Sequence, residues 1–467
     1  DRSDRSMLVT VLMAFSSSSS ALMMADLQER VAKTAFGSQL KAEDELRTQG
    51  RGPPSRTARL RLFEERDGYE PRVVLYRDSA AWCPYCQKVW MLLEEKNIPY
   101  RVELINMRSY GDKPSSFLSK VPGGFLPAIE LDGDVVTESL DIMALLDRTF
   151  SQSSVTLVPE DELPKIRELL RLERQLFRAW CDYVFRGGFG SKGAFERTLK
   201  TVDDAIAGPF FLGSHLSLVD LQYVSHVERM SASVAYWKGD VLRGNPAYPK
   251  INAWFEALEE RPSYRASRSD YYTHVKDIPP QYGDGVFDRQ KSKAASEALT
   301  GGDWHLLSRE TPPPLEVQLQ PGWEREFATA HVEASYRLLQ NLDAVVKFAS
   351  RPAGSGVGRW AFARPDRAKL ADPYAEPATK EETLDDLKSA LVVVAAVLAS
   401  SSSSSSGDLL LSAAELKGDL ANKIRDQKTT ATCLAYLRDR VGVPRDMSFP
   451  AARCLRSTLN WAIDTLK

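Results

Sequence analysis

The chain of 467 residues is poor in the residues that bind metals or cross-link small folds. It has only five cysteines and five histidines. An odd number of cysteines in a long chain does not fit a small scaffold held by disulfides. A structural zinc site needs a second cysteine or histidine pair at ligand spacing, and Cys181, Cys433 and Cys454 lie far apart in sequence. We therefore expect neither a disulfide framework nor a metal cofactor.

Charge of one sign and long apolar runs are also scarce. The formal net charge is only -2, which argues against the strongly basic surface typical of nucleic-acid binding. One wholly apolar stretch, residues 390–399, is shorter than the roughly 20 residues that span a bilayer. Asp385, Asp386 and Lys388 precede it. We expect a buried core helix there, no membrane span and no nucleic-acid partner.

The motif Cys83-Pro84-Tyr85-Cys86 is the most informative feature that the chain does contain. Residues 73–76 resemble a short buried strand and residues 87–96 carry apolar side chains at helical spacing, so the motif joins a strand to a helix. Pro84 suits the first helical turn, whose free amides point toward the Cys83 sulfur. Thiols in such positions ionise more readily than free cysteine. The sequence therefore predicts that Cys83 is a reactive thiolate.

The segments after this motif alternate between strand and helix patterns. A second strand, a short helix, a hairpin around Asp132-Gly133 and a further helix follow. The expected ranges are 100–105, 114–120, 128–131 with 135–137, and 139 onward. The order predicted is βαβαββα. The charged neighbours Arg77 and Lys88 are expected in solvent.

Residues 73 to about 150 resemble the thioredoxin-like domain of the cytosolic glutathione transferase superfamily. The motif at residues 83–86, Leu126-Pro127 and Glu138-Ser139 carry this resemblance. It implies a cysteine-type active site of the omega or glutaredoxin kind, with glutathione as co-substrate. Cys83 would be the nucleophile, and Cys86 a second thiol able to resolve a mixed disulfide.

The resemblance also implies a set of glutathione-binding residues. The proline matching Pro127 is cis in the family and presents the backbone of the preceding residue, here Leu126, to glutathione. Glu138 would face the γ-glutamyl ammonium, and Ser139 with its helix-start amides would hold the carboxylate. Lys113 matches a lysine that contacts glutathione in the cysteine-type members. The alternatives are a plain helix cap for Glu138-Ser139 and a solvated lysine.

Aromatic residues suggest where an acceptor substrate would bind. One interpretation places a group of aromatic side chains along a cleft between two domains, with Tyr85 also among the glutathione-binding residues. The other interpretation makes these side chains ordinary core. The group consists of Tyr76, Trp82, Tyr85, Trp180 and Tyr183.

The segment after residue 160 resembles the all-helical C-terminal domain of the same superfamily. Residues 162–183 form a long amphipathic pattern, Ser217-Leu218-Val219-Asp220 is a capping box, and residues 248–262 resemble the last core helix. The resemblance covers roughly residues 70–275. Beyond it, helices are predicted at 324–349, 383–399, 411–437 and 450–466.

The fold class predicted is therefore α/β plus all-α, in three folded parts after a leader. We expect that a chain ending near residue 275 still folds. The ranges are 1–70 for a leader or targeting segment, 71–150 for the thioredoxin-like domain, 160–275 for the helical domain, and 320–467 for a helical extension with a serine-rich linker at 400–406.

Two classes of function remain open from the sequence. The first is glutathione-dependent thiol transfer, such as deglutathionylation, disulfide reduction or dehydroascorbate reduction. The second is a non-catalytic or regulatory module on the same fold. With either function, the protein could form a homodimer. The apolar run at residues 7–15 after Arg2 and Arg5, together with a likeness to plastid-directed plant and algal members, favours the plastid over the cytoplasm.

Overall fold

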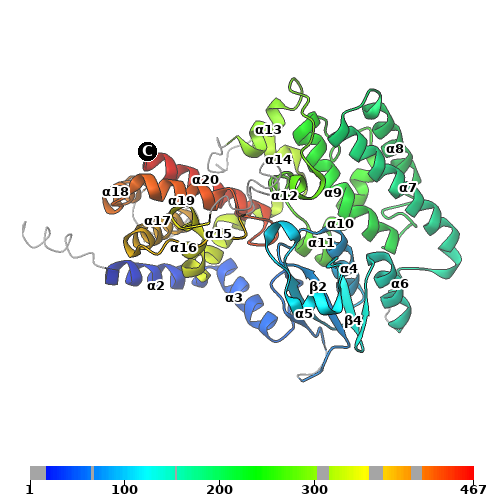
Figure 1. The fold of residues 1–467 in the computed structure, drawn as a ribbon, viewed down its shortest axis with the longest axis horizontal. Coiled ribbons are helices and arrows are strands. Elements are labelled where there is room, and N and C mark those ends of the chain that lie inside the picture. Colours follow the sequence, from blue (N-terminus) through cyan, green and yellow to red (C-terminus); the bar gives the residue numbers. More distant parts are fainter. Residues whose placement is uncertain (1–16, 65–67, 153–154, 302–314, 357–371, 401–412) are drawn as a thin grey trace, which may run out of the picture.

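The structure is a computed structural model that describes residues 17–64, 68–152, 155–301, 315–356, 372–400 and 413–467. Figure 1 shows the sheet and the green helices on one side, and the yellow to red helices of the extension on the other. Each side has its own hydrophobic core. The first core runs from Val73 to Leu319 along the chain, and the second joins Leu27 and Val31 to residues between Trp323 and Leu466.

The sheet is five-stranded with the order β1-β3-β2-β4-β5. Strands β2 and β3 are parallel and every other pair is antiparallel. The central strand β2 is buried because it pairs on both sides, Leu75 with Val102 of β3 and with Ile129 of β4. Strand β1 was not predicted and adds one edge. The bounds are Leu60–Arg61, Val73–Asp78, Tyr100–Ile105, Ala128–Leu131 and Asp134–Val136 for β1 to β5.

The predicted order βαβαββα is confirmed by the elements that follow Val73. Helix α4 is buried on nearly every side, because it lies between the sheet and the second, helical part of the first core. The three helices of this βαβαββα unit are α4 (Pro84–Glu95), α5 (Ser115–Lys120) and α6 (Ser139–Thr149).

The helical part of the first core is built around α9 (Leu218–Lys238), of which nearly every residue is buried. Its start is the predicted capping box: Asp220 Oδ2 accepts the Ser217 amide at 2.8 Å, and its Oδ1 accepts the Trp254 indole N–H at 2.9 Å. The surrounding helices are α7 (Leu163–Cys181) with a π-helical turn at Asp182–Arg186, α8 (Ser191–Ala205), α10 (Pro249–Glu259), α11 (Pro262–Ser267), α12 (Tyr271–Tyr282), α13 (Lys293–Thr300) and α14 (Leu315–Leu319).

The extension is helical as predicted, but two of its expected helices are broken. The helix expected over 324–349 is a 3-10 turn and two helices separated at Asn341, whose backbone leaves the helical region. The helix expected over 411–437 is interrupted before Asp426, which caps the next helix by accepting the Thr429 amide at 3.0 Å. The bounds are Glu324–Thr329 (η4), Ala330–Gln340 (α15), Leu342–Ala349 (α16), Glu381–Ser400 (α17), Ala413–Lys423 (α18), Gln427–Arg438 (α19) and Phe449–Thr465 (α20).

Helix α17 contains the apolar stretch 390–399, and its side chains form the middle of the second core, as the sequence predicts. None of the helices in the described part of the chain is both long and apolar enough to cross a membrane. Apart from Ser400, which ends α17, the serine run lies outside the described residues.

The segment expected to be a leader is partly folded onto the extension. Helices α2 (Ser17–Lys33) and α3 (Ala35–Thr48) pack beside α15, and Figure 1 shows the blue α2 alongside the yellow helices. Asp44 of α3 forms an ion pair with Arg337 of α15 at 2.9 Å. The apolar run at 7–15 lies outside the described residues. The part of this segment from residue 17 onward thus contributes to the second core and to the sheet edge, in contrast to the expected leader.

The two cores meet along α12. Across this junction Arg456 of α20 pairs with Asp270 at 2.6 Å, and the Val443 amide donates to Thr273 Oγ1 at 3.0 Å. The boundary expected at residue 275 falls inside α12, whose Val275 and Ile278 belong to the first core. A chain ending there would lose half of a core helix, so the expected domain limit has to move beyond α12.

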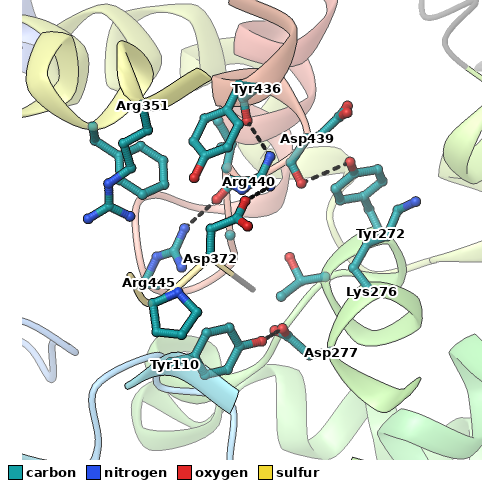
Figure 2. Close-up of a pocket in the computed structure, with 15 residues that line it drawn as sticks. Tyr110, Tyr272, Lys276, Asp277, Arg351, Asp372, Tyr436, Asp439, Arg440 and Arg445 are labelled. Atoms are coloured by element: carbon teal, nitrogen blue, oxygen red, sulfur yellow. Dashed lines mark hydrogen bonds and ion pairs between the residues drawn. The ribbon is translucent and has the colours of Figure 1, made fainter. Parts of the chain in front are cut away.

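A cavity of about 110 Å³ lies at this junction, and Figure 2 shows charged side chains of α12 and of the extension around it. Asp277 of α12 accepts a hydrogen bond from the Tyr110 hydroxyl. Burial raises the pKa of Asp277 from its ordinary 3.8 to about 7, while Arg445 acts against the rise. The folded chain therefore holds a proton that the unfolded chain releases at lower pH.

We predict that this proton makes stability fall as the pH rises from about 4 to about 7, since the folded state binds more protons in that window. Asp277→Asn should remove this dependence and stabilise the protein at pH 8 by about 1 kcal/mol, allowing for partial solvent access. Urea unfolding at pH 5 and pH 8 measures both effects. Equal pH dependence in the two proteins would contradict the assignment.

Candidate active site

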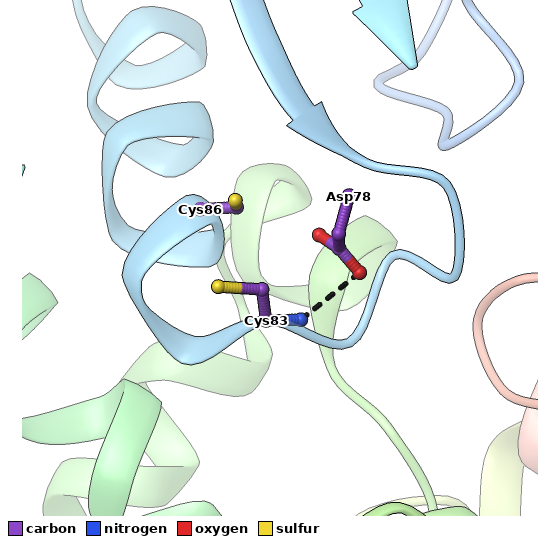
Figure 3. Close-up of side chains that lie close together, drawn as sticks. All are labelled: Asp78, Cys83 and Cys86. Atoms are coloured by element: carbon purple, nitrogen blue, oxygen red, sulfur yellow. Dashed lines mark hydrogen bonds between the residues drawn. The ribbon is translucent and has the colours of Figure 1, made fainter. Parts of the chain in front are cut away.

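Cys83 caps the start of α4, and Pro84 occupies its first turn, as the sequence predicts. The loop before it is held by Asp78, whose Oδ2 accepts the amides of Trp82 at 2.6 Å and of Cys83 at 3.1 Å. Figure 3 shows this carboxylate beside both thiols. The Cys83 side chain is 8% exposed, so it borders the surface without projecting from it. The geometry places the sulfur at the positive end of a helix.

Cys86 lies deeper than Cys83 and is 2% exposed. Burial, followed by a hydrogen bond and the charge of Cys83, raises the pKa of the Cys86 thiol well above its usual value. Cys86 is therefore a neutral thiol at physiological pH, whereas only thiolates attack disulfides. The two sulfurs are chemically unequal, and the outer one is the candidate nucleophile.

Donor atoms of Asp78, Cys83 and Cys86 lie within 4.8 Å of one another. A structural zinc site takes four ligands, one more than this cluster offers. The cluster combines two thiols with a carboxylate. The absence of a metal cofactor remains a prediction.

Leu126 and Pro127 lie beside the end of β2 that leads to Cys83. The β2–β4 ladder ends at the pair Tyr76–Ala128, which leaves the Leu126 backbone beyond the ladder. The Leu126-Pro127 peptide bond is cis, as the resemblance implies. Leu126 is half-buried and has no backbone hydrogen bond within the described residues. Its N–H and C=O are thus available to an extended ligand.

Glu138 and Ser139 form the start of α6, which packs against α4. Ser139 is buried and Glu138 is exposed. Glu138 has a φ of 64°, a left-handed backbone conformation that costs a non-glycine residue about 1–3 kcal/mol. The fold thus holds an acid in a strained conformation at a helix N-terminus, where its carboxylate reaches solvent.

Lys113 and Tyr85 are both half-buried near the thiols. Lys113 Nζ donates to the Asn106 carbonyl at 2.8 Å, and burial lowers the pKa of Lys113 while the nearby cysteines oppose the change. The Tyr85 ring packs edge-on against His226 with centroids 5.5 Å apart. Lys113 is therefore a partly enclosed cation beside the thiols, not a freely solvated lysine.

The prediction that Arg77 and Lys88 are solvated is wrong. They are 2% and 1% exposed, because the face of α4 that carries Lys88 packs against α9 and the end of β2 is covered on both sides. Lys88 Nζ donates to Gln222 Oε1 at 2.6 Å, and Gln222 donates to Glu173 at 3.1 Å. Burial lowers the pKa of Lys88 to about 8.

Sequence reasoning also missed the groups that hold the active-site loop from below. Arg229 of α9 donates to the Trp82 carbonyl and, at 3.0 Å, to Gln87 Oε1. The Trp82 indole donates to His274 Nδ1 at 3.0 Å, and the other nitrogen of His274 lies 2.8 Å from Glu228. These partners come from α9 and α12, far along the chain, so no local pattern indicates them. Among the residues near Cys83 in sequence, only Asp78 could have indicated how the loop is held.

The aromatic group divides between core and site. Trp82 and Trp180 are fully buried and hydrogen-bonded, Tyr183 is buried, and Tyr76 packs on Phe117 in a separate small core. These four are therefore core side chains, in agreement with the second interpretation of the sequence. Tyr85 alone of the group is half-exposed beside the thiols.

Comparison with known proteins places this geometry in a family. The model of the glutathione S-transferase N-terminal domain matches residues 82–149, and that of the C-terminal domain matches residues 171–257. Glutathione S-transferase L3 of Arabidopsis thaliana is 32% identical over 198 residues, which are 40% of this chain and 79% of that protein.

Two further relatives match between a third and just under a half of this chain. Glutathione S-transferase DHAR2 of Arabidopsis thaliana is 29% identical over 33% of this chain and 70% of its own length. Glutathione transferase Omega 3C from Trametes versicolor is 29% identical, with a TM-score of 0.39 over 43% of this chain and 86% of that one. The chain therefore belongs to the glutathione S-transferase family and contains both of its domains, with the cysteine-type active-site motif.

Proposed function

We propose that the protein transfers thiols through a glutathione mixed disulfide on Cys83. The observation that supports this most is the unequal thiol pair at the start of α4, with a surface-bordering Cys83 and an enclosed, neutral Cys86. A serine or tyrosine hydroxyl would only hold glutathione, whereas a cysteine thiolate exchanges with disulfides. Membership of the glutathione S-transferase family supports glutathione as the co-substrate.

The reaction is a pair of exchanges. The Cys83 thiolate attacks the glutathione sulfur of a glutathionylated substrate, the substrate thiolate leaves, and glutathione remains bonded to Cys83. A second glutathione thiolate then attacks the bound glutathione sulfur, which releases oxidised glutathione and restores the Cys83 thiolate. Alternatively, Cys86 attacks Cys83 and releases reduced glutathione. Disulfides and dehydroascorbate are further candidate acceptors.

Glutathione would lie across the edge formed by Leu126 and the start of α6. The available N–H and C=O of Leu126 would pair with the cysteinyl backbone, in the manner of an added strand. The exposed Glu138 carboxylate would meet the γ-glutamyl ammonium, and Ser139 with the first amides of α6 would bind its carboxylate. Lys113 supplies a cation and Tyr85 an aromatic wall on the thiol side.

Removal of either polar side chain at the start of α6 tests this placement. Glu138→Ala and Ser139→Ala should each weaken glutathione binding by about 1.5–3 kcal/mol, the usual contribution of a hydrogen bond to a charged group. Isothermal titration with reduced glutathione measures the change, and Asp141→Ala, an exposed acid in the first turn of α6, is the matched control. Unchanged affinity in both variants would place glutathione elsewhere.

A panel of glutathionylated peptide, hydroxyethyl disulfide and dehydroascorbate tests the activity itself. We expect turnover with at least the first two substrates. No turnover with any of them, combined with measurable glutathione binding, would favour the non-catalytic module on the same fold.

A plastid location and a homodimer are also proposed, and cell fractionation and size-exclusion chromatography test them. The support for the plastid is the apolar run after two arginines near the start of the sequence.

A further inference from the structure

A cavity of about 170 Å³ lies where the segment before the sheet meets both cores, and its lining is rich in arginine. Helix α3 and the loop after it, α11 of the first core, and α15 with the loop between α19 and α20 all contribute to it. Figure 1 shows α3 between the sheet and the yellow helices of the extension. Three glutamates line the cavity, against five arginines: Arg47, Arg56, Arg265, Arg268 and Arg337.

Two of these arginines share one carboxylate, that of Asp44 in α3. Arg47 pairs with it, and Arg337 of α15 pairs with it at 2.9 Å. The same carboxylate also accepts the Tyr336 hydroxyl at 3.1 Å and the Gln340 side-chain amide at 2.8 Å. One negative charge therefore serves two guanidinium groups and two neutral donors.

Arg56 has no ion pair with a carboxylate in the described part of the chain. Its Nε donates to the Arg445 carbonyl at 2.5 Å, and its Nη2 donates to the Asp446 carbonyl. Burial, followed by the charge of Arg337, lowers the pKa of Arg56 from 12.5 to about 10, although Asp446 and Glu333 act against the change. Asp446 is itself paired with Arg445 at 2.8 Å. Arg56 thus remains a cation that its neighbours only partly balance.

The glutamates of the lining are shared in the same way. Glu326 pairs with both Arg265 and Arg268, at 3.2 and 2.5 Å. Glu333 accepts the Ser448 amide at 2.8 Å and its hydroxyl at 2.5 Å. With the shared carboxylate of α3 included, five arginines stand against four acids around the cavity. The site therefore carries an excess of positive charge.

Two of the arginines also have donors without an acceptor. The Nε groups of Arg268 and Arg337 are buried and have no hydrogen-bond partner within the described residues. Arg268 is 2% exposed. Buried donors normally have a partner, and an uncompensated charge is costly to enclose. The unmet donors and the excess charge both favour a negatively charged acceptor in this cavity.

We propose that the cavity binds a small oxyanion of the phosphate type, either inorganic phosphate or the phosphate group of a small monoester. Guanidinium groups bind phosphate through paired N–H donors, and its oxygens accept from several of them at once. Pro53, Pro54 and Trp323 form an apolar part of the lining that suits the organic part of a monoester. Because the arginines come from α3, the loop after it, α11 and α15, the anion joins the N-terminal segment and the first core to the extension.

Isothermal titration of the full chain with sodium phosphate at pH 8 and constant ionic strength measures this binding, with sodium chloride and sodium acetate as controls. We expect saturable binding of phosphate and an unfolding temperature that rises with phosphate concentration, and neither effect with the controls. Binding should persist in saturating glutathione, because the cavity and the thiol site have different residues. Equal effects of chloride or acetate, or competition with glutathione, would overturn the inference.

Arg56→Gln should weaken phosphate binding about tenfold or more, the usual loss for a hydrogen bond to a charged group. Arg351→Gln, in the 110 Å³ cavity beside α12, is the matched control and should bind phosphate as the wild type does. Wild-type affinity in Arg56→Gln, or a loss only in Arg351→Gln, would place the anion elsewhere.

Ser55 provides a second test should Arg56→Gln not fold. It is half-buried in the loop after α3, lines the cavity and accepts a hydrogen bond from Arg47 at 3.2 Å. Ser55→Asp places a negative charge beside Arg47 and should weaken phosphate binding about tenfold, whereas Ser55→Asn, of the same size without the charge, should change it little. Equal phosphate affinity in these two variants would contradict the site.

Glycerol phosphate distinguishes the two sources of the anion. Tighter binding than that of inorganic phosphate assigns the cavity to a monoester, and weaker binding assigns it to free phosphate. Both results support the site. Binding that Ser55→Asp leaves unchanged for both anions overturns it. Thiol transfer is not measured in any of these titrations, so their failure would leave the proposed function intact.

Discussion

Cys83→Ser is expected to reduce thiol transfer to the uncatalysed background. The serine hydroxyl is not ionised at neutral pH and cannot form a mixed disulfide, whereas serine is a favoured residue at the N-cap position of α4, so the fold should stay intact. Turnover of hydroxyethyl disulfide measures the loss, and thermal unfolding checks that the variant is folded. Substantial remaining turnover would show that another thiol carries the reaction.

Two serine variants provide the comparison. Cys86→Ser should retain part of the turnover of glutathione mixed disulfides, because external glutathione can resolve the intermediate. Cys181→Ser should change little, because burial raises the pKa of this half-exposed thiol to about 11 and keeps it neutral. Mass spectrometry after treatment with oxidised glutathione should find one glutathione on Cys83. An adduct on Cys86 in preference to Cys83 would reverse the assignment of the two thiols.

Arg456→Met is expected to destabilise the protein by about 3–5 kcal/mol, the usual cost of removing one partner of a buried ion pair. Arg456 and Asp270 are both 0% exposed, and their side chains are joined at 2.6 Å between α20 and α12. The guanidinium also donates to the Val441 carbonyl at 2.7 Å and lies 4.0 Å from the centre of the Tyr272 ring. Its loss leaves an unpaired carboxylate at the junction of the two cores. Urea unfolding measures the change.

A substitution of Asp270, the other residue of the pair, tests whether the unpaired charge causes the loss of stability. Asn at position 270 can still cap α12, so Arg456→Met with Asp270→Asn should regain most of the lost stability. The exposed pair of Lys388 and Asp343 is the control, and Lys388→Ala should cost less than about 1 kcal/mol. If Arg456→Met costs no more than Lys388→Ala, the junction does not depend on this ion pair.

The sequence was sufficient for those parts of the site that local chemistry determines. The local backbone geometry of three features depends on residues close in sequence. They are Cys83 before Pro84 at a strand–helix join, Leu126-Pro127 before a strand, and Glu138-Ser139 at a helix start. Their positions could be predicted because backbone geometry follows from adjacent residues. Which of them bind glutathione remains a prediction.

Lys88 and Arg229 could not be placed from the sequence, for a physical reason. Charged side chains on a short helix normally face water, and only the packing of α9 against α4 encloses Lys88. Its partner Gln222 is over a hundred residues away, so no pattern of spacing joins them. Likewise, the helix break at Asn341 and the packing of α2 on α15 depend on contacts between distant segments.

Helix α12 belongs to both cores at once, and this has a consequence for cooperativity. Val275 and Ile278 face the first core, while Asp270 and Tyr272 bind α20 and the loop after α19. Opening of the extension therefore removes partners from a helix that also supports Trp82 through His274. Amide hydrogen exchange in α12 should therefore be slow while the extension is packed against it, and should become faster when the extension unfolds locally. The free energy of local unfolding around Trp82, next to Cys83, thus depends on the stability of the extension.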